Sequence, residues 1–341
     1  METEAARLHK PFDVQVEKVE LPDQGTLDVL VKIEACGVCP FDVRLYKGLS
    51  TTAYPKILGH EIAGTVLETG RDVTGVQRGD KVVVEPAIRC NRCFYCLRGE
   101  HNLCLNTKWP FGGFAKHVVV PETSLHRFSA ISPLEASFTE PLSCCLNGMM
   151  RAGLEPGSDV AIIGDGPIGL LHLQLAHVLG AARVIVTGMI DQRLERARRL
   201  GATGTLSAAK GDAANEVKAR FDNLGADVVM VTVGTAGALQ EAVGMAKKGG
   251  RVIQFAGICP EVDIPFSARF IHYSQVWLTG SVDSTPFQFA RALKLLELGR
   301  VKVADFVSHE YGLGDVVKAI ETASNLSGFK VMIRPWGNVS R

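Results

Sequence analysis

Four cysteines lie close together in the first third of the chain, and their spacing is that of a metal site. The pattern is Cys-x2-Cys-x2-Cys-x7-Cys, formed by Cys90, Cys93, Cys96 and Cys104. Four thiolates at this spacing can close a tetrahedral cage around one zinc ion. The segment before the last cysteine is polar and broken by Gly99, so the metal is expected to replace a core. The alternatives are disulfides or buried free thiols, but such clusters in intracellular enzymes usually bind metal.

A second set of residues has the chemistry of an open metal site. Cys39 ends a short Cys-x2-Cys segment, His60 and Glu61 are adjacent, and Glu140 precedes a proline. Thiolate, imidazole and carboxylate all bind zinc, and fewer than four fixed ligands leave room for water or an alcohol. Spacing alone does not group these residues. A lone histidine is more often a satisfied core residue, and a glutamate before proline is often only a helix start.

A glycine-rich loop in the second half indicates nucleotide binding. Its residues are Gly164, Asp165, Gly166, Pro167, Ile168 and Gly169. The loop follows an apolar run and precedes an apolar helix expected at 170–179. Glycines here allow a tight turn, close approach of the backbone to a pyrophosphate, and a helix N-terminus that holds the phosphates. The alternative is a structural turn, but the strand-turn-helix context favours a dinucleotide site.

The acidic residue expected at the end of the next strand is missing. Gly188 occupies that position, and Asp191 comes three places later. An acid there would bind the ribose 2′-hydroxyl and repel a 2′-phosphate, so its absence permits NADP as well as NAD. Arg193 is the candidate to reach the ribose, or else it lies on the solvated face of its helix.

The motifs fall into two halves that differ in periodicity. Up to about residue 150, short β-like runs at 29–33, 62–66 and 81–84 predict a mostly β domain. From residue 159 onward, apolar strands alternate with helices, which predicts a parallel sheet covered on both faces. Those strands are expected at 160–163, 183–187, 227–233 and 251–255, with helices at 193–200 and 236–247. A last helix is expected at about 286–298, followed by an apolar run at 329–333.

Composition and charge exclude several classes of protein. A chain of 341 residues suggests two domains, and 46% hydrophobic with 21% charged residues is typical of a soluble globular protein. Lysine and arginine number 37 against 36 acidic residues, so net charge gives no reason to expect nucleic acid or a membrane as partner. The acidic start lacks the apolar core of a signal peptide, and the apolar stretch 162–186 is interrupted by polar residues. A cytoplasmic protein is therefore expected.

The motifs occur in an order that resembles zinc-dependent medium-chain alcohol dehydrogenases. The resemblance covers nearly the whole chain: the segment ending at Cys39, Gly59-His60-Glu61, the four-cysteine lobe, Glu140-Pro141-Leu142-Ser143 and the 164–169 loop. Glu-Pro-Leu at the third metal position looks like the sorbitol (polyol) and threonine dehydrogenase branch. The resemblance implies an α/β fold, with a Rossmann-type doubly wound parallel sheet and a β-rich GroES-like catalytic domain that carries the zinc lobe. The expected boundaries are 1–149 for the catalytic domain, 150–284 for the dinucleotide domain, and 285–341 for the return to the catalytic domain.

The same resemblance implies the roles of the candidate residues. Cys39, His60 and either Glu61 or Glu140 would hold a catalytic zinc, while the other carboxylate acts through water or exchanges with substrate. Implied cofactors are two zinc ions per chain and NAD or NADP. The implied reaction is hydride transfer from a secondary hydroxyl of a polyol, sugar or related small alcohol, by a homodimer or homotetramer. The alternatives are an L-threonine or simple secondary-alcohol dehydrogenase, and a catalytically silent NAD(P)H-binding sensor.

Some positions depart from the family pattern. Phe41 stands where relatives carry a hydroxyl that passes the substrate proton onward, so Glu140 is the expected general base, with Glu61 as the alternative. Asp283 lies near the place where the polyol branch often has an arginine, which argues against sorbitol itself. Trp109 and Phe111 lie in a segment that is shorter than in relatives, and they are expected either to line the active site or to pack structurally.

Overall fold

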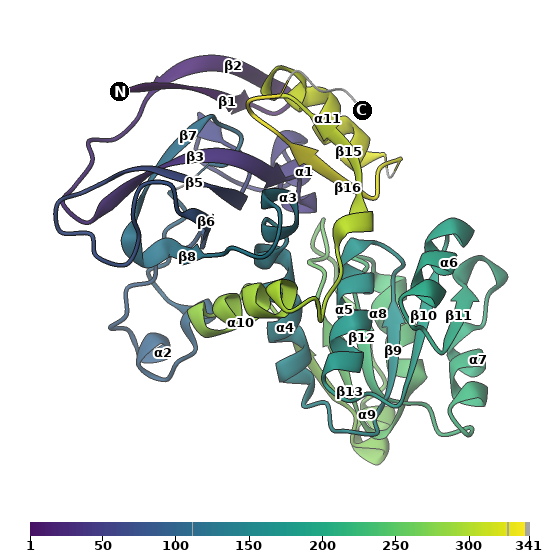
Figure 1. Ribbon diagram of the computed structural model, residues 1–341. Coiled ribbons are helices and arrows are strands. Elements are labelled where there is room, and N and C mark those ends of the chain that lie inside the picture. Colours follow the sequence, from purple (N-terminus) through teal and green to yellow (C-terminus); the bar gives the residue numbers. More distant parts are fainter. Residues whose placement is uncertain (111, 326, 338–341) are drawn as a thin grey trace. The chain divides into compact units, whose positions relative to one another are not determined.

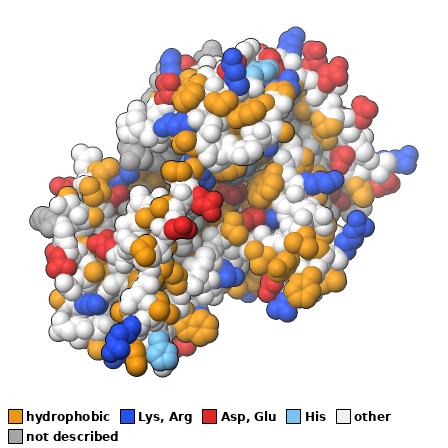
Figure 2. Space-filling view, turned by 180° about the vertical axis from the view of Figure 1, so that it is seen from behind, with side chains coloured by type: hydrophobic (Ala, Val, Ile, Leu, Met, Phe, Trp, Pro, Cys, Tyr) orange, Lys and Arg blue, Asp and Glu red, His pale blue; other side chains and the backbone are white. Residues whose placement is uncertain are grey.

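The computed structural model describes residues 1–110, 112–325 and 327–337, which form two compact units (Figure 1). One unit comprises Met1–Pro141 with Thr285–Arg341, and the other is Leu142–Ser284. The second half of the chain therefore contributes to both units, because its last segment returns to the first. Acidic and basic side chains are intermixed on the face drawn in Figure 2. No helix in the described part of the chain has both the length and the apolar character needed to cross a membrane.

The first unit is built on two β-sheets. The larger sheet has the order β15-β16-β3-β5-β6-β8, with β7 also paired to β3. Its strands are β3 (Asp28–Gly37), β5 (Glu61–Thr69), β6 (Lys81–Val84), β7 (His117–Pro121), β8 (Leu125–Arg127), β15 (Val307–Tyr311) and β16 (Lys330–Ile333). The smaller sheet contains β1 (Glu2–Lys10), β2 (Asp13–Glu20) and β4 (Lys56–Ile57). The β-rich fold predicted for this half is confirmed.

Helices also belong to this unit. They are α1 (Pro40–Tyr46), α2 (Phe94–Leu97), α3 (Pro133–Ala136), the start of α4 (Thr139–Ala152), α10 (Pro286–Glu297) and α11 (Val316–Ser324). Alternate residues of β3, including Val31 and Ile33, are fully buried and pack in one core with α11. Burial of β-branched side chains on a pleated face favours a strand here.

The last strand of the chain, β16, lies beside the segment that precedes α1. Strand β16 runs antiparallel to β3, with Met332 opposite Gly37 and Ile333 opposite Cys36. The Val38 N–H also donates to the Val331 carbonyl at 2.9 Å. This register places Lys330 beside the segment that leads into Cys39.

The second unit is a six-stranded parallel sheet with helices between successive strands. The sheet has the order β11-β10-β9-β12-β13-β14. Its strands are β9 (Asp159–Ile163), β10 (Arg183–Gly188), β11 (Gly204–Ser207), β12 (Ala226–Val231), β13 (Ala246–Gln254) and β14 (Trp277–Gly280), and its helices are α5 (Pro167–Val178), α6 (Asp191–Arg199), α7 (Ala213–Arg220), α8 (Ala236–Met245) and α9 (Ala268–Ser274). The strand order reverses direction between β9 and β12, so the sheet is doubly wound as predicted. Ligands of such sheets bind at the carboxyl ends of the strands near this reversal.

Candidate metal and dinucleotide sites

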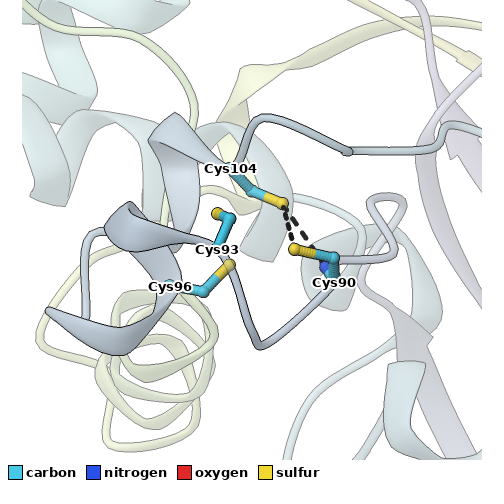
Figure 3. A group of neighbouring side chains, drawn as sticks. All are labelled: Cys90, Cys93, Cys96 and Cys104. Atoms are coloured by element: carbon cyan, nitrogen blue, oxygen red, sulfur yellow. Dashed lines mark hydrogen bonds between the residues drawn. The ribbon is translucent and has the colours of Figure 1, made fainter.

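The four-cysteine lobe brings its sulfur atoms together as the spacing predicted. Helix α2 begins directly after Cys93, and a single 3-10 turn, His101–Leu103, leads to Cys104. The four Sγ atoms lie within 4.8 Å of one another, and Figure 3 shows the four side chains gathered in one place. The chain's nine cysteines are all free thiols, and the Cys90 and Cys104 sulfurs are 3.5 Å apart, too far for a disulfide.

The backbone of the lobe favours thiolates at two of its corners. Hydrogen bonding by the Arg92 N–H lowers the pKa of Cys90 to about 6, and the N–H groups of Cys90 and Asn106 lower that of Cys104. Burial and the neighbouring sulfurs raise the pKa of Cys96 to about 12, so this sulfur needs a positive charge to ionise. Zinc supplies such a charge, and four convergent sulfurs are its usual structural ligand set. The lobe therefore fits a zinc ion held by four cysteines.

Three of the four candidates for the open metal site also converge. The ligand atoms of Cys39, His60 and Glu61 lie within 4.8 Å of one another. Cys39 is the residue before α1, whereas His60 directly precedes β5 and Glu61 is its first residue, so two separate segments meet. Glu140 lies outside this group, in the first turn of α4, where the helix N-terminus favours a carboxylate.

Asp42 contacts and orients His60, the histidine of the cluster. Its buried carboxylate accepts hydrogen bonds from the backbone N–H of Cys39 at 3.0 Å and of Gly59 at 2.9 Å, and it faces His60 Nδ1 at 3.7 Å. Burial lowers the pKa of His60, but the charges of Asp42 and Cys39 outweigh it and raise that pKa well above its usual value. A carboxylate on Nδ1 orients the ring and leaves the other nitrogen for a metal.

Lys330 forms an ion pair with Glu61, the carboxylate of the cluster. Its Nζ donates to Glu61 Oε1 at 2.7 Å and to the Val38 carbonyl at 3.3 Å, and it also contacts Glu61 Oε2. Burial opposes the charge, yet Glu61, Cys39 and Glu140 together raise the pKa of Lys330. A Cβ at Gly37 would lie 1.9 Å from Glu61 Oε2. Any side chain at position 37 would therefore collide with the Glu61 carboxylate, and only glycine fits there.

The nearby Cys36 differs from Cys39 in its environment. Cys36 is fully buried, and burial together with the charges of Asp42 and Glu61 raises its pKa well above the usual value. It is therefore a core thiol, while Cys39 is the sulfur that takes part in the cluster. Phe41 is 40% exposed, and its ring lies 6.2 Å from the His60 ring, edge-on.

Sequence reasoning missed both Asp42 and Lys330. Asp42 is the third residue of a helix whose first residue is Pro40, a position from which a carboxylate reaches back to the preceding backbone N–H. Lys330 is the one charged residue in the otherwise apolar strand Lys330–Ile333. A charged side chain in a buried strand needs a partner, which is the signal that could have revealed it.

The glycine loop has the geometry of a dinucleotide site. Gly164 has φ +121°, and a Cβ there would lie 2.3 Å from Thr232 Oγ1. A Cβ at Gly169 would lie 2.0 Å from the Gly164 carbonyl oxygen, whereas one at Gly166 would meet nothing within 4 Å. Two glycines thus permit the turn and the packing, and the third leaves open space before α5, which Pro167 and Ile168 begin. A pyrophosphate fits this cradle at the helix N-terminus.

The remaining predicted residues lie as follows. Gly188 ends β10 beside Asp165, and Arg193 Nη1 is 4.0 Å from Asp165 Oδ1. Asp283 has φ 57°, and its Oδ1 accepts from the Ser284 N–H at 2.7 Å. Trp109 is 44% exposed beneath the Arg89 guanidinium, and Phe111 lies outside the described residues.

Comparison with known proteins connects these sites to one family. Residues 25–130 match the family model of the alcohol dehydrogenase GroES-like domain, and residues 167–298 match that of the zinc-binding dehydrogenase. The chain is 32% identical to sorbitol dehydrogenase of Bacillus subtilis (strain 168), with 97% of each chain covered. It is 31% identical to L-threonine 3-dehydrogenase of Bacillus velezensis, over 95% of this chain and 96% of that protein. A solved zinc-binding dehydrogenase from Sinorhizobium meliloti 1021, bound to NADP, superposes with a TM-score of 0.93 at 32% identity, covering 98% of this chain and 100% of the other.

Proposed function

The chain belongs to the zinc-dependent medium-chain alcohol dehydrogenases, and we propose that it oxidises a secondary hydroxyl of a polyol, sugar or related small alcohol with NAD or NADP. The family makes it an oxidoreductase with zinc and a nicotinamide dinucleotide as cofactors. The supporting observation is the convergence of Cys39, His60 and Glu61 from two segments into a three-ligand group. A donor set of this kind, unlike the closed lobe, leaves a coordination position for substrate.

The open cluster supports a division of roles among its residues. Zinc bound there supplies a Lewis acid that lowers the pKa of a coordinated alcohol. Cys39 and His60 would act as fixed ligands, and Asp42 would keep the His60 ring oriented through Nδ1. The carboxylate of Glu61 is shared between this cluster and the Lys330 ammonium, which competes with a metal for the same oxygens.

That competition favours Glu140 for the proton transfer. Lys330 contacts both carboxylate oxygens of Glu61, and Glu140, in the first turn of α4, acts on Lys330 only as the weakest of the charges that raise its pKa. Phe41 has no hydroxyl to relay the proton, so a carboxylate is needed. We assign Glu140 as the general base and as the carboxylate that exchanges with substrate.

The dinucleotide is held by the second unit. Gly164, Gly166 and Gly169 let the backbone approach the pyrophosphate, and the N-terminus of α5, begun by Pro167 and Ile168, stabilises its charge. A nicotinamide held there would supply the hydride acceptor, and Glu140 would take the alcohol proton. The hydroxyl carbon is thereby oxidised by two electrons to a carbonyl.

An oligomer formed through β14 is part of the proposal. Strand β14 is the edge of the six-stranded sheet, and its Trp277 and Leu278 are 64% and 38% exposed. An unpaired strand edge with exposed apolar side chains pairs readily with another chain. We propose a homodimer or homotetramer, and light scattering of Trp277→Lys against the parent chain tests it.

The substrate class is tested by steady-state reduction of NAD and NADP over a panel of polyols, sugars, L-threonine and simple secondary alcohols. Turnover of a polyol or sugar alcohol well above that of L-threonine supports the proposal. Preference for L-threonine or a simple secondary alcohol would correct the substrate. Dinucleotide binding without turnover of any compound would instead indicate a silent NAD(P)H-binding sensor.

A further inference from the structure

The end of β10 has no acidic side chain of its own, but a carboxylate reaches it from the glycine loop. Asp165 Oδ2 accepts hydrogen bonds from the backbone N–H groups of Met189 and Ile190, each at 2.8 Å. Strands β9 and β10 are parallel neighbours, with Ile163 opposite Thr187, so the two loops that follow them are adjacent. Asp165 is 7% exposed and bridges these loops.

Asp165 explains why residue 188 is glycine. A Cβ at Gly188 would lie 2.3 Å from Asp165 Oδ2, 2.4 Å from its Cβ and 2.5 Å from its Cγ. These distances are far below van der Waals contact, so a side chain at 188 and the observed Asp165 exclude each other. The acid missing from the end of β10 is thus supplied by a different residue of the same site.

The position of this carboxylate bears on the adenosine ribose. In dinucleotide-binding sheets, the acid that reads the ribose 2′-hydroxyl lies at the end of the second strand. Asp165 is bonded to the two residues directly after that point. A 2′-phosphate would meet a negative charge there and would find two backbone N–H donors already occupied.

The nearby cation is also turned toward Asp165. Arg193 Nη1 lies 4.0 Å from Asp165 Oδ1, and the Arg193 side chain is only 13% exposed. An arginine at this place could pair with a 2′-phosphate, but here part of its charge is balanced by the carboxylate. The Sinorhizobium relative was solved with NADP bound, so this fold accepts NADP, and any selection against it in this chain must come from local residues.

We propose that Asp165 selects NAD against NADP in this chain. This inference rests on the proposed function, since it requires that the 164–169 loop bind a nicotinamide dinucleotide. It replaces the expectation, drawn from the missing acid at Gly188, that NADP is permitted as well as NAD.

The test measures the dissociation constants of NAD and NADP by calorimetry for the parent chain, Asp165→Asn and Asp165→Ala. Asparagine keeps an oxygen that can accept the Met189 and Ile190 N–H groups, so it removes the charge and preserves the loop. We expect both variants to bind NADP more tightly, on the order of tenfold, with little change for NAD. Asp191→Asn is the matched control, because Asp191 is an exposed acid of the first turn of α6.

Moving the acid from position 165 to position 188 separates the effect of its charge from the effect of a damaged loop. Gly188→Asp alone would collide with Asp165, but Asp165→Gly combined with Gly188→Asp restores an acid at the strand end. We expect Asp165→Gly to tighten NADP binding and the double variant to recover selection of NAD. The gain in NADP affinity should shrink at high ionic strength, because it is a charge effect.

The outcomes distinguish this inference from the proposed function. If the ratio of the NAD and NADP dissociation constants is the same in the parent and in all Asp165 variants, Asp165 does not select the cofactor. The dehydrogenase assignment then stands. If the Asp191→Asn control shifts the ratio as much as Asp165→Asn, the effect is one of net charge and the inference fails. If the parent binds neither dinucleotide, both proposals are overturned.

Discussion

At the scale of single residues, the candidate catalytic cluster depends on two buried charges that flank it. Asp42 faces His60, and Lys330 contacts both oxygens of Glu61, which is 1% exposed. A buried carboxylate without a partner is costly, so Lys330 permits a carboxylate to exist beside Cys39 and His60. It also limits how much of the charge of Glu61 is available to a metal.

Replacement of Lys330 by methionine is expected to destabilise the fold. Lys330→Met leaves Glu61 buried and unpaired, and should cost about 3–5 kcal/mol of unfolding free energy. Lys318→Met is the matched control, because the Lys318 ion pair with Asp315 is exposed and such pairs contribute little. Chemical denaturation of both variants measures the difference. Equal stability of the two variants would contradict the buried ion pair.

Replacement of Glu140 tests the proposed proton transfer. Glu140→Gln keeps the size of the side chain but cannot take a proton, so kcat should fall by about 10²–10⁴-fold while zinc and dinucleotide stay bound. Adding Phe41→Ser should partly restore kcat by supplying a hydroxyl. Steady-state kinetics with zinc analysis measures both effects. Full zinc content with unchanged kcat in Glu140→Gln would assign the base to Glu61 or to water.

At the scale of elements, the zinc lobe has little apolar structure of its own. Helix α2 has only the four residues Phe94–Leu97, and Phe94 and Leu97 are 64% and 76% exposed. A metal bound by the four convergent thiolates would therefore take the place of a core.

Cys96→Ser is expected to release the lobe zinc and lower the melting temperature, because it opens the cage at its most buried sulfur. Cys259→Ser is the control, since Cys259 belongs to neither cysteine cluster. Elemental analysis and thermal unfolding of the two variants provide the measurements. A Cys96→Ser protein with full zinc and unchanged melting would show that the lobe is stable without its metal cage.

Helix α5 contains a histidine that should weaken the fold in acid. His172 is fully buried, neither ring nitrogen has a hydrogen-bond partner among the described residues, and burial lowers its pKa to about 3. Its pKa in the folded state lies below the unfolded value of 6.5. Below pH 6.5 the unfolded state therefore binds a proton that the folded state does not bind. Stability is therefore unaffected above the unfolded pKa and falls as the pH drops toward the folded pKa.

His172→Leu should remove this loss, which amounts to about 2 kcal/mol at about pH 5. The exposed His272 provides the control variant, His272→Leu. Unfolding free energies at neutral and acidic pH measure the effect. Parallel pH profiles for the parent and His172→Leu would mean that His172 takes up a proton without penalty in the fold.

The elements predicted correctly from the sequence are those whose apolar pattern is continuous. Strands β9, β10 and β12 and the final strand β16 appear close to their predicted residues. Strand β11 and helix α7 were missed, because Gly204–Ser207 has few apolar residues and Ala213–Arg220 buries only Ala213 and Val217. Asp42 and Lys330 were missed for a different reason. Lys330 reaches Glu61 only through the pairing of β16 with β3, which local pattern does not reveal.

At the scale of the whole molecule, two separate ligand sets predict two zinc ions of different lability. The lobe offers four sulfurs, whereas the open cluster offers Cys39, His60 and a carboxylate. A closed cage of thiolates should resist chelation longer than an open site. Elemental analysis during chelation should therefore show a fast loss of one zinc per chain and a slow loss of the second. A single zinc in never-chelated protein would exclude the open metal site.

His60→Ala should separate these two zinc ions by mutation. The variant lacks one ligand of the open cluster but keeps all four cysteines of the lobe, so the fold and one zinc per chain should remain. Dinucleotide binding by calorimetry should be unchanged, because the 164–169 loop belongs to the other unit. Near-normal kcat in this variant would be incompatible with oxidation that depends on a metal at the open cluster.

The most direct test of zinc-dependent oxidation is a zinc titration of protein from which only the labile metal has been removed. The substrate is the best alcohol or polyol of the panel, and the signal is the absorbance of reduced dinucleotide. Activity should be absent at the start, rise in proportion to added zinc and stop rising at one equivalent per chain, with His60→Ala showing no recovery. Undiminished dinucleotide reduction by the stripped protein, before any zinc is added, would contradict the proposed function of the Cys39, His60 and Glu61 cluster.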